Sequence, residues 1–313
     1  MPKSLIIATS FAGPAAARLA ALGHQVLLTE ADRPWEQAMR ADVLWTGPMP
    51  AWRSAPAPAG WPGKLSLIQS ASTGINDYPR WMFEGVTFAC TRGVSSIPIA
   101  EFAVAAMLGF VKRWDDIRVT APTQRPANPG LGTLHGQTLG LLGFGSIGRE
   151  IAMRALAFGM QIKAARRSAE AAVMPGVVIS SSWPEVLADA DHVVLALPST
   201  TSTRRALGRE AFLQVRRGCH LVNVSRGDIV DHEALLAALD DGRVGGATLD
   251  VTDPEPLPAD HPLYRHPRVR ISPHLSWSSD GMMERVTNGF LANLERFSAE
   301  QPLLDVVDRN AGY

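Results

Sequence analysis

The chain has little cysteine, no excess of charge of either sign and no long uncharged apolar run. Its two cysteines, Cys90 and Cys219, cannot build a disulfide framework, and their spacing does not match a metal site. Thirty basic residues balance thirty acidic ones, so no nucleic acid or anionic membrane is expected as a partner. No apolar run reaches the roughly 18 residues of a membrane span, and no signal-peptide pattern precedes the first apolar run. We therefore expect a cytoplasmic protein without a bound metal.

Short apolar runs alternate with amphipathic segments along most of the 313 residues. This alternation predicts βαβ units and parallel sheets, and the length favours two domains. The expected strands are residues 5–8, 26–29, 42–45, 65–69, 86–89, 139–142, 161–165, 192–197, 219–224, 246–251 and 269–272. The expected helices include 14–22, 34–40, 96–114 with Ser96 as N-cap, one begun by Ser182, 231–239 with Asp231 as N-cap, and 279–297. Residues 47–63, rich in proline, are expected to form a loop without a helix.

A Gly-x-Gly-x-x-Gly pattern near the middle of the chain joins an expected strand to an expected helix. In a dinucleotide site the first glycine, Gly143, makes the tight turn, and Gly145 lets the backbone approach the pyrophosphate. The third, Gly148, lets the helix pack closely on the strand, and the first turn of that helix contains Ser146 and Ile147. The helix N-terminus offers N–H groups to phosphate. Glycines in such a turn also serve packing alone, but the surrounding βαβ pattern favours a nucleotide.

The end of the following strand predicts which cofactor binds. An NAD site typically has Asp or Glu there, to bind the ribose 2′-hydroxyl. This chain has Arg166, Arg167 and Ser168 at that place, and no carboxylate before Glu170. Guanidinium groups pair with phosphate oxygens, so NADP(H) is preferred, with NAD(H) as the other cofactor considered. A solvated basic loop is the simpler alternative.

Three later strands are each followed by a charged or titratable residue: Arg226, Glu255 and His274. Ligands of α/β sheets bind at the carboxyl ends of parallel strands. Each residue alone has an ordinary explanation as a surface or loop side chain. Together, behind a nucleotide motif, they indicate an active site.

These motifs, in the order Gly-x-Gly-x-x-Gly, Asn-x-x-Arg-Gly, Asp-Val-x-x-x-Glu-Pro and Pro-His, resemble the D-isomer-specific 2-hydroxyacid dehydrogenase family. The resemblance covers essentially the whole chain. Local features at Trp45 and at residues 112–116, 255–258, 266–269 and 307–313 are similar to the bacterial glyoxylate/hydroxypyruvate reductases of that family.

The resemblance implies an oxidoreductase with a role for each residue of the site. Arg226 would hold the substrate carboxylate and carbonyl oxygen, and His274 would be the general acid. Glu255 would orient the imidazole and favour its protonated form. Asp250 would orient the nicotinamide carboxamide. The other cofactor-binding residues implied are Leu197, Pro198, Ser199, Val224, Ser225 and Ser276. The substrate-binding residues implied, besides Arg226, are Thr73 and Gly74 in a carboxylate-binding loop, and Trp45 and Trp277 in the pocket wall. For either tryptophan, packing in the core is the alternative.

The implied fold is α/β, with two Rossmann-like or flavodoxin-like domains, parallel sheets and an active site in the interdomain cleft. Residues 1–98 with 286–313 would form the substrate domain, and 99–285 the dinucleotide-binding domain. The apolar helix after Pro98 would pack at a homodimer interface, with intrachain burial as the alternative.

The expected activity is NADPH-preferring reduction of glyoxylate or hydroxypyruvate to a D-2-hydroxy acid. Two departures from the family pattern affect the substrate: the loop reads Gly74-Ile75-Asn76, and a bulky Trp277 follows His274. The alternatives are a related dehydrogenase acting on a bulkier 2-oxo acid or on phosphite, and a nucleotide-sensing, corepressor-like binding protein.

Overall fold

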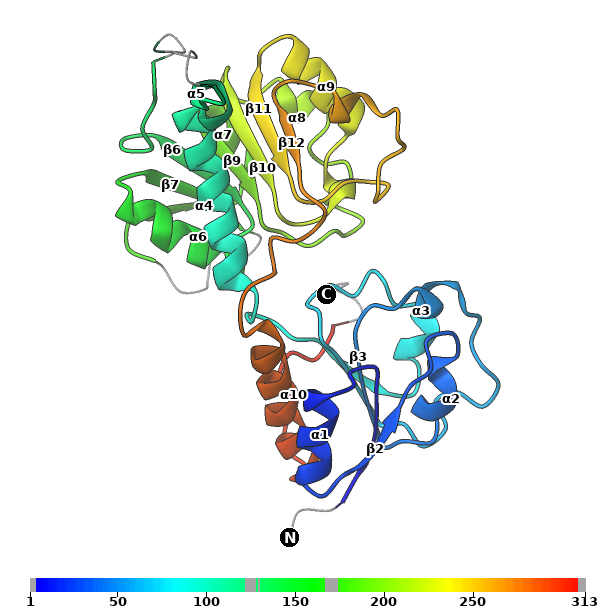
Figure 1. Ribbon diagram of the computed structural model, residues 1–313. Coiled ribbons are helices and arrows are strands. Elements are labelled where there is room, and N and C mark those ends of the chain that lie inside the picture. Colours follow the sequence, from blue (N-terminus) through cyan, green and yellow to red (C-terminus); the bar gives the residue numbers. More distant parts are fainter. Residues whose placement is uncertain (1–3, 122–127, 129, 167–173, 309–313) are drawn as a thin grey trace. The chain divides into compact units, whose positions relative to one another are not determined.

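The computed structural model describes residues 4–121, 128, 130–166 and 174–308. The chain forms two compact units, Met1–Val94 with Asp280–Tyr313, and Ser95–Ser279. We refer to them as the first and the second unit, and each contains one sheet (Figure 1).

The first unit is built on a five-stranded sheet in the order β2-β1-β3-β4-β5, with every pair parallel. Its strands are β1 (Ile6–Thr9), β2 (Gln25–Leu28), β3 (Val43–Thr46), β4 (Leu67–Ser70) and β5 (Thr87–Ala89). Its helices are α1 (Pro14–Ala21), α2 (Pro34–Ala38), α3 (Pro50–Ser54), the 3-10 helix η1 (Arg80–Phe83) and α10 (Met282–Ser298). This is the strand order of flavodoxin-like sheets.

Helices cover both faces of that sheet. Leu19 of α1 and Phe290 of α10 pack in one core cluster with Ile7 and Leu67 of the strands. On the other face α2, α3 and η1 pack in a second cluster, which includes the buried Trp52. Figure 1 shows α1 and α10 on one side of the sheet and α2 and α3 on the other. Burial on both faces explains why these strands read as continuous apolar runs.

The second unit has a seven-stranded parallel sheet in the order β12-β11-β10-β9-β6-β7-β8. Its strands are β6 (Thr138–Leu142), β7 (Gln161–Ala165), β8 (Val177–Ser180), β9 (His192–Leu195), β10 (Cys219–Asn223), β11 (Val244–Leu249) and β12 (Val269–Ile271). Its helices are α4 (Ser96–Lys112), α5 (Trp114–Ile117), α6 (Ser146–Ala157), α7 (Trp183–Ala188), α8 (Arg209–Phe212), α9 (His232–Asp240), and the 3-10 helices η2 (Gly227–Ile229) and η3 (Pro262–Tyr264). The chain reverses its direction of progress across the sheet between β6 and β9, which makes a Rossmann-type switch point.

Two core clusters lie on the two faces of this sheet. Helices α4 and α6 pack over one face, and α7, α8 and α9 pack over the other. The switch point places the end of β6, and with it the glycine turn, beside the end of β9. The predicted α/β class with two parallel sheets is confirmed.

Several local expectations are also confirmed, and others are wrong. Ser182 and Asp231 cap their helices, since their side chains accept hydrogen bonds from backbone N–H groups of the first turn. Helix α4 begins at Ser96 with Ser95 as N-cap, so Ser96 is not the cap. The expected loop 47–63 contains α3, because Pro50 stands at the first helical position, where a missing N–H costs nothing. Strand β8 was not expected from the sequence.

The part of the chain that the structure describes contains no helix long and apolar enough to cross a membrane. In the same residues, no group of three or more His, Cys, Asp and Glu side chains is arranged to hold a metal.

Candidate functional site

The glycine turn between β6 and α6 has the geometry that a dinucleotide cradle requires. Gly143 has a φ of +102°, and a Cβ there would lie 2.3 Å from the carbonyl oxygen of Ala196. A Cβ on Gly148 would lie 2.4 Å from the carbonyl oxygen of Gly143. A Cβ on Gly145 would meet no atom of the described residues within 4 Å, so the turn is open there with respect to that part of the chain. Two glycines are therefore required by packing, and the middle one leaves room for a ligand.

Helix α6 starts at this turn with Gly145 as N-cap, and no side chain of the described residues caps it. Its first N–H groups and the positive end of its dipole are therefore suited to a phosphate. Ser146 and Ile147 lie in its first turn. Arg166 follows β7 directly, and its backbone N–H donates to Ser180. The other two residues expected to recognise a 2′-phosphate, Arg167 and Ser168, lie outside the described residues.

The loop after β9 contains Leu197, Pro198 and Ser199. The Ser199 hydroxyl donates a 2.7 Å hydrogen bond to Oδ2 of Asp228, two residues after Arg226. This bond joins the loop after β9 to the loop after β10.

Asn223, the last residue of β10, organises the loop that carries Arg226. The Asn223 side chain is fully buried, and its Oδ1 accepts from the backbone N–H and the hydroxyl of Ser225 at 3.0 and 2.9 Å. Its Nδ2 donates to the carbonyl oxygen of Arg226 at 2.9 Å. The Arg226 guanidinium donates to the carbonyl oxygen of Ser225 at 2.6 Å. The neighbouring Val224 is buried.

Gly227 holds this loop against the loop after β11. A Cβ on Gly227 would lie 2.0 Å from the backbone carbon of Thr252, so only glycine allows the approach. Since Thr252 lies three residues before Glu255, this contact sets the spacing between the loops that carry Arg226 and Glu255.

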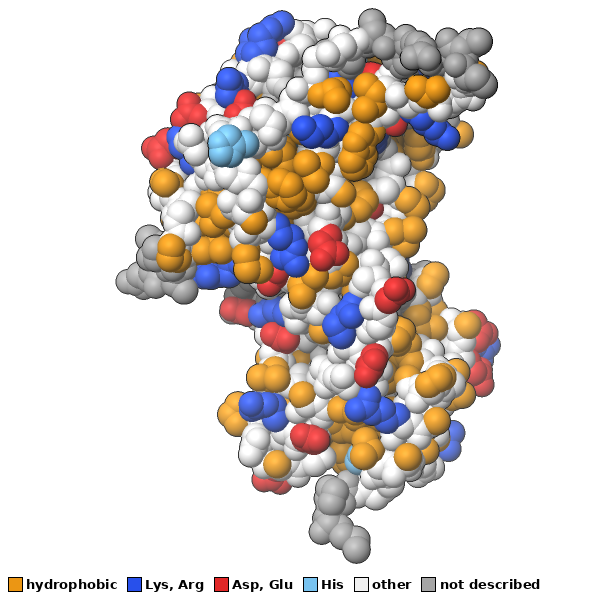
Figure 2. All heavy atoms as spheres, turned by 60° about the vertical axis from the view of Figure 1, so that its left-hand side comes forward, with side chains coloured by type: hydrophobic (Ala, Val, Ile, Leu, Met, Phe, Trp, Pro, Cys, Tyr) orange, Lys and Arg blue, Asp and Glu red, His pale blue; other side chains and the backbone are white. Residues whose placement is uncertain are grey.

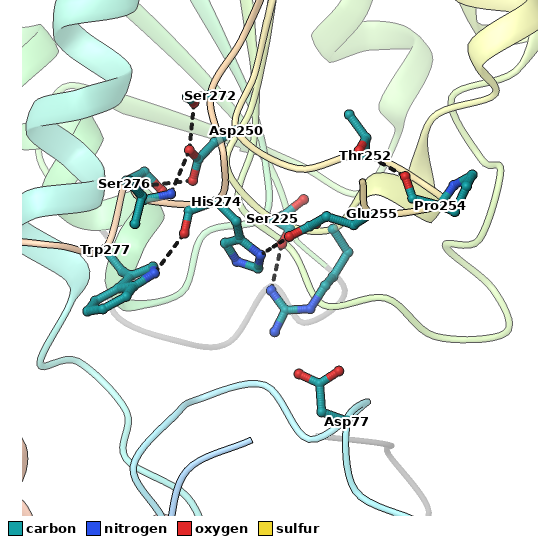
Figure 3. Close-up of polar contacts among 12 residues, drawn as sticks. Asp77, Ser225, Asp250, Thr252, Pro254, Glu255, Ser272, His274, Ser276 and Trp277 are labelled. Carbon is teal, nitrogen blue, oxygen red and sulfur yellow. Dashed lines mark hydrogen bonds and ion pairs between the residues drawn. The ribbon is translucent and has the colours of Figure 1, made fainter. Parts of the chain in front are cut away.

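His274 and Glu255 form a direct pair in the second unit (Figure 3). Nδ1 of His274 lies 2.8 Å from Oε1 of Glu255, and both side chains are about two-fifths exposed. An ionised carboxylate only accepts, so Nδ1 carries a proton and Nε2 is the nitrogen with which the ring can exchange a second one. This is the arrangement of an oriented general acid.

The carboxylate of Asp250 lies beside this pair and binds the loop after β12. It accepts hydrogen bonds from the Ser272 hydroxyl at 2.6 Å, the Leu275 amide at 3.0 Å and the Ser276 amide at 2.9 Å. Trp277 donates its indole N–H to the carbonyl oxygen of His274 at 2.8 Å, and its side chain is exposed. Figure 3 shows these contacts around one turn of chain.

In the first unit, the expected carboxylate loop follows β4. The Thr73 hydroxyl donates to the carbonyl oxygen of Thr91 at 2.6 Å, and the Ser72 hydroxyl donates to that of Gly74 at 3.0 Å. Asp77 at the end of the loop forms an ion pair with Arg53 of α3.

The structure corrects the expectation for Trp45. Its side chain is fully buried, with its ring stacked on Phe290 at 4.6 Å and an interplanar angle of 1°. The Phe11 ring also packs against Trp45, at a centroid distance of 4.6 Å. Trp45 is therefore a core residue of the first unit and not a pocket wall, because β3 is buried on both faces.

Two further histidines lie at the opposite edge of the second sheet, where β9 and β10 begin. Their Nδ1 atoms are 3.2 Å apart, His192 Nε2 lies 2.8 Å from Gln137 Oε1, and His220 Nε2 lies 3.1 Å from Thr248 Oγ1. Burial lowers the pKa of His192 to about 4, against a smaller opposing effect of Asp191. Burial, with His192 and Arg270 as lesser causes, places the pKa of His220 well below its usual range.

Sequence reasoning missed two residues of the candidate site: Asn223 as the anchor of the Arg226 loop, and Ser272 as a partner of Asp250. Both lie at or just past the end of a buried strand and carry a hydrogen-bonding side chain. That position was the available signal, since a polar side chain at such a place needs a partner.

Comparison with known proteins agrees with this geometry. Residues 104–276 match the family model described as "D-isomer specific 2-hydroxyacid dehydrogenase, NAD binding domain". Glyoxylate reductase from Thermofilum pendens is 32% identical over 241 residues, which are 74% of this chain and 71% of the relative. Glyoxylate/hydroxypyruvate reductase A from Serratia proteamaculans is 33% identical over 221 residues, 68% of each chain.

D-3-phosphoglycerate dehydrogenase from Bacillus subtilis is 32% identical over 251 residues, 78% of this chain, and the match spans 47% of the relative's own length. Among solved structures, a glyoxylate reductase from Paecilomyes thermophila superposes with a TM-score of 0.82 at 24% identity, covering 99% of this chain and 100% of that one. At that identity the match supports the fold alone.

The Rossmann-type sheet, the glycine turn and the strand-end residues define a nicotinamide-dependent oxidoreductase. The chain belongs to the D-isomer-specific 2-hydroxyacid dehydrogenase family. The predicted family and enzyme class are confirmed: it is an NAD(P)-dependent D-2-hydroxyacid dehydrogenase acting on small 2-oxo or 2-hydroxy acids.

Proposed function

We propose that this enzyme is an NADPH-preferring reductase of small 2-oxo acids, with glyoxylate or hydroxypyruvate as substrate and a D-2-hydroxy acid as product. The observation that carries the proposal is the 2.8 Å pair of His274 and Glu255. These residues follow β12 and β11, and Arg226 follows the adjacent β10. A proton donor and a carboxylate-binding cation are thus supplied by neighbouring strand ends.

The proposed steps use these side chains in order. Arg226 binds the substrate carboxylate and stabilises the negative charge that grows on the carbonyl oxygen. The hydride would come from a reduced nicotinamide, when one is bound. The His274 imidazolium gives its Nε2 proton to the carbonyl oxygen, while Glu255 keeps the ring oriented through Nδ1 and stabilises its charge. Thr73 and Gly74 are proposed, on the family resemblance, to bind a carboxylate through their loop.

The cofactor preference rests on the residues that follow β7. Arg166 stands where an NAD site typically has a carboxylate, and the sequence continues with another arginine and a serine. A 2′-phosphate adds charge that guanidinium groups pair with, so NADPH is proposed over NADH. The pyrophosphate site proposed at the turn of Gly143, Gly145 and Gly148 does not depend on which of the two cofactors binds.

The apolar helix α4 is the proposed homodimer surface. Ile97 at its start and Trp114 just beyond its end are about half exposed. Figure 2 shows hydrophobic side chains gathered on the face of the second unit in that view. Exposed apolar groups of this kind mark association surfaces. A mass of 33.7 kDa in solution, the mass of one chain, would contradict the dimer.

The test is a steady-state panel of glyoxylate, hydroxypyruvate, pyruvate and 4-methyl-2-oxopentanoate, each with NADPH and with NADH. Trp277 adds bulk next to His274, so we expect kcat/KM for the best small acid to exceed that for the bulky acid roughly tenfold or more. For each acid that turns over, we expect kcat/KM with NADPH to exceed kcat/KM with NADH. A preference for the bulky acid, or for NADH, would contradict the corresponding part of the proposal.

A further inference from the structure

His274 adopts a backbone conformation that residues other than glycine seldom adopt. Its φ is +55°, in the left-handed region, where the Cβ of an L-residue crowds its own backbone. A free loop would leave this conformation, and the imidazole would then turn away from Glu255. Contacts elsewhere in the folded chain must therefore hold the His274 backbone in the left-handed conformation.

Asp250 supplies hydrogen bonds on both sides of His274. Its backbone carbonyl accepts from the His274 N–H at 2.9 Å. Its carboxylate accepts from the Ser272 hydroxyl before His274, and from the Leu275 and Ser276 amides after it, at 2.6, 3.0 and 2.9 Å. One residue, directly after β11, accepts all four bonds, and Figure 3 shows its carboxylate with Ser272 and Ser276.

The Asp250 carboxylate forms its hydrogen bonds with residues 272–276, the turn that contains His274. Asp250 is 1% exposed, and a buried carboxylate needs donors to replace water. A carboxylate has about four acceptor positions, and three donors of the loop reach it. Two of them are amides directly following His274, and such charge-assisted bonds are stronger than neutral ones.

We propose that Asp250 is a positioning residue for the general acid: it holds the turn 272–276 so that His274 stays left-handed and Nδ1 stays on Glu255. Ser272 supports it by fixing the carboxylate. The catalytic part of this inference rests on the proposed function, but the structural part does not. It adds a task to the orientation of the nicotinamide carboxamide, for which the family resemblance first singled Asp250 out.

The first experiment follows amide hydrogen exchange at Leu275 and Ser276 in the cofactor-free enzyme. Leu275 is 52% exposed and its amide donates to the Asp250 carboxylate, so we expect this bond to be the main protection of the amide from exchange. Asp250→Asn replaces one acceptor oxygen with an NH₂ group, and we expect both amides to exchange roughly tenfold faster or more. Unchanged exchange in Asp250→Asn would overturn the proposal.

The second experiment uses Ser272→Ala, which keeps the carboxylate intact for any contact with the cofactor. We expect faster exchange at Leu275 and Ser276, kcat lowered roughly threefold to tenfold, and a cofactor Kd unchanged within about twofold. Ser272→Thr keeps the hydroxyl and should restore the wild-type exchange rates and kcat. Ser278 is an exposed serine of the same segment, so Ser278→Ala is the matched control and should leave the exchange rates and kcat unchanged.

The outcomes separate the two proposals. A wild-type enzyme that turns over no 2-oxo acid would contradict the proposed function, while the exchange rates would still test the anchor. An active wild type whose Ser272→Ala variant loses cofactor affinity at unchanged exchange would overturn the anchor alone, because Asp250 would then act through the cofactor.

Discussion

The two edges of the seven-stranded sheet both carry histidines, in opposite environments. At the carboxyl edge, His274 is partly exposed, left-handed and bonded to the Glu255 carboxylate. At the amino edge, His192 and His220 are buried, and His220 stacks on Phe110 of α4 at 4.3 Å with an interplanar angle of 1°. Gly246 leaves space for the Phe110 ring, because a Cβ on Gly246 would lie 2.8 Å from that ring.

The amino-edge contacts also specify the tautomers. Gln137 Oε1 is an acceptor, so His192 Nε2 donates to it and His192 Nδ1 accepts. His220 Nδ1 then donates to His192, and the Thr248 hydroxyl donates to His220 Nε2. Every ring nitrogen thus has a partner while both rings are neutral, and burial disfavours the charge that a further proton would add. The difference between the edges teaches that a carboxylate partner and water make one histidine suitable for proton transfer, whereas burial and neutral partners make the other two structural.

The largest expected effect is a loss of activity from a substitution at the carboxyl edge. Arg226→Ala should lower kcat and raise KM together, with kcat/KM reduced roughly a thousandfold, because the substrate loses its carboxylate ligand and charge stabilisation in the transition state. Steady-state kinetics measure the loss, and urea unfolding should show little change in stability. A change in cofactor affinity alone would count against the assigned role.

His220→Ala should produce the reverse pattern at the amino edge. It removes the ring stacked on Phe110, leaves a cavity, and takes partners from His192 and Thr248. We expect the free energy of unfolding to fall by about 3 kcal/mol, and kcat of the folded enzyme to stay within about twofold of wild type. Urea denaturation and kinetics on the same sample measure both; a large loss of kcat at unchanged stability would break the division between the edges.

The third expected effect is a pH dependence of stability, which comes from the buried histidines at the amino edge. The pKa of His192 is about 4 in the fold and 6.5 in its ordinary state, so the unfolded chain binds more protons between these values. Stability should therefore be full above about pH 6.5 and fall as pH drops toward 4, by up to roughly 1.4 kcal/mol per pH unit for each such group.

The groups around this pair that also bear on its charge are Asp191 and Arg270. The matched control is His192→Gln, which does not titrate. Its free energy of unfolding should fall less steeply over pH 6.5 to 4 than that of wild type, as measured by urea denaturation at each pH. Equal slopes would show that His192 does not take up a proton on unfolding.

Much of this arrangement was predictable, because it depends on local pattern. The glycine turn and the alternation of apolar and amphipathic segments predict a Rossmann-type unit, and residues just past buried strands mark Arg226, Glu255 and His274. The roles of other residues depend on contacts far apart in the sequence. Trp45 lies on a strand buried on both faces, so periodicity alone does not separate core from pocket. The His192–His220 pair exists because β9 and β10 are neighbours in register. The hydrogen bonds of Asp250 depend on how the loop after β12 folds back.

The measurement that tests the account most directly is a single turnover of enzyme-bound NADPH with glyoxylate or hydroxypyruvate, followed by the loss of its absorbance, for wild type and His274→Ala. We predict that the variant binds the cofactor with unchanged affinity and oxidises it roughly a thousandfold more slowly, because it lacks the proton donor. Near-normal oxidation by the variant would contradict His274 as the general acid.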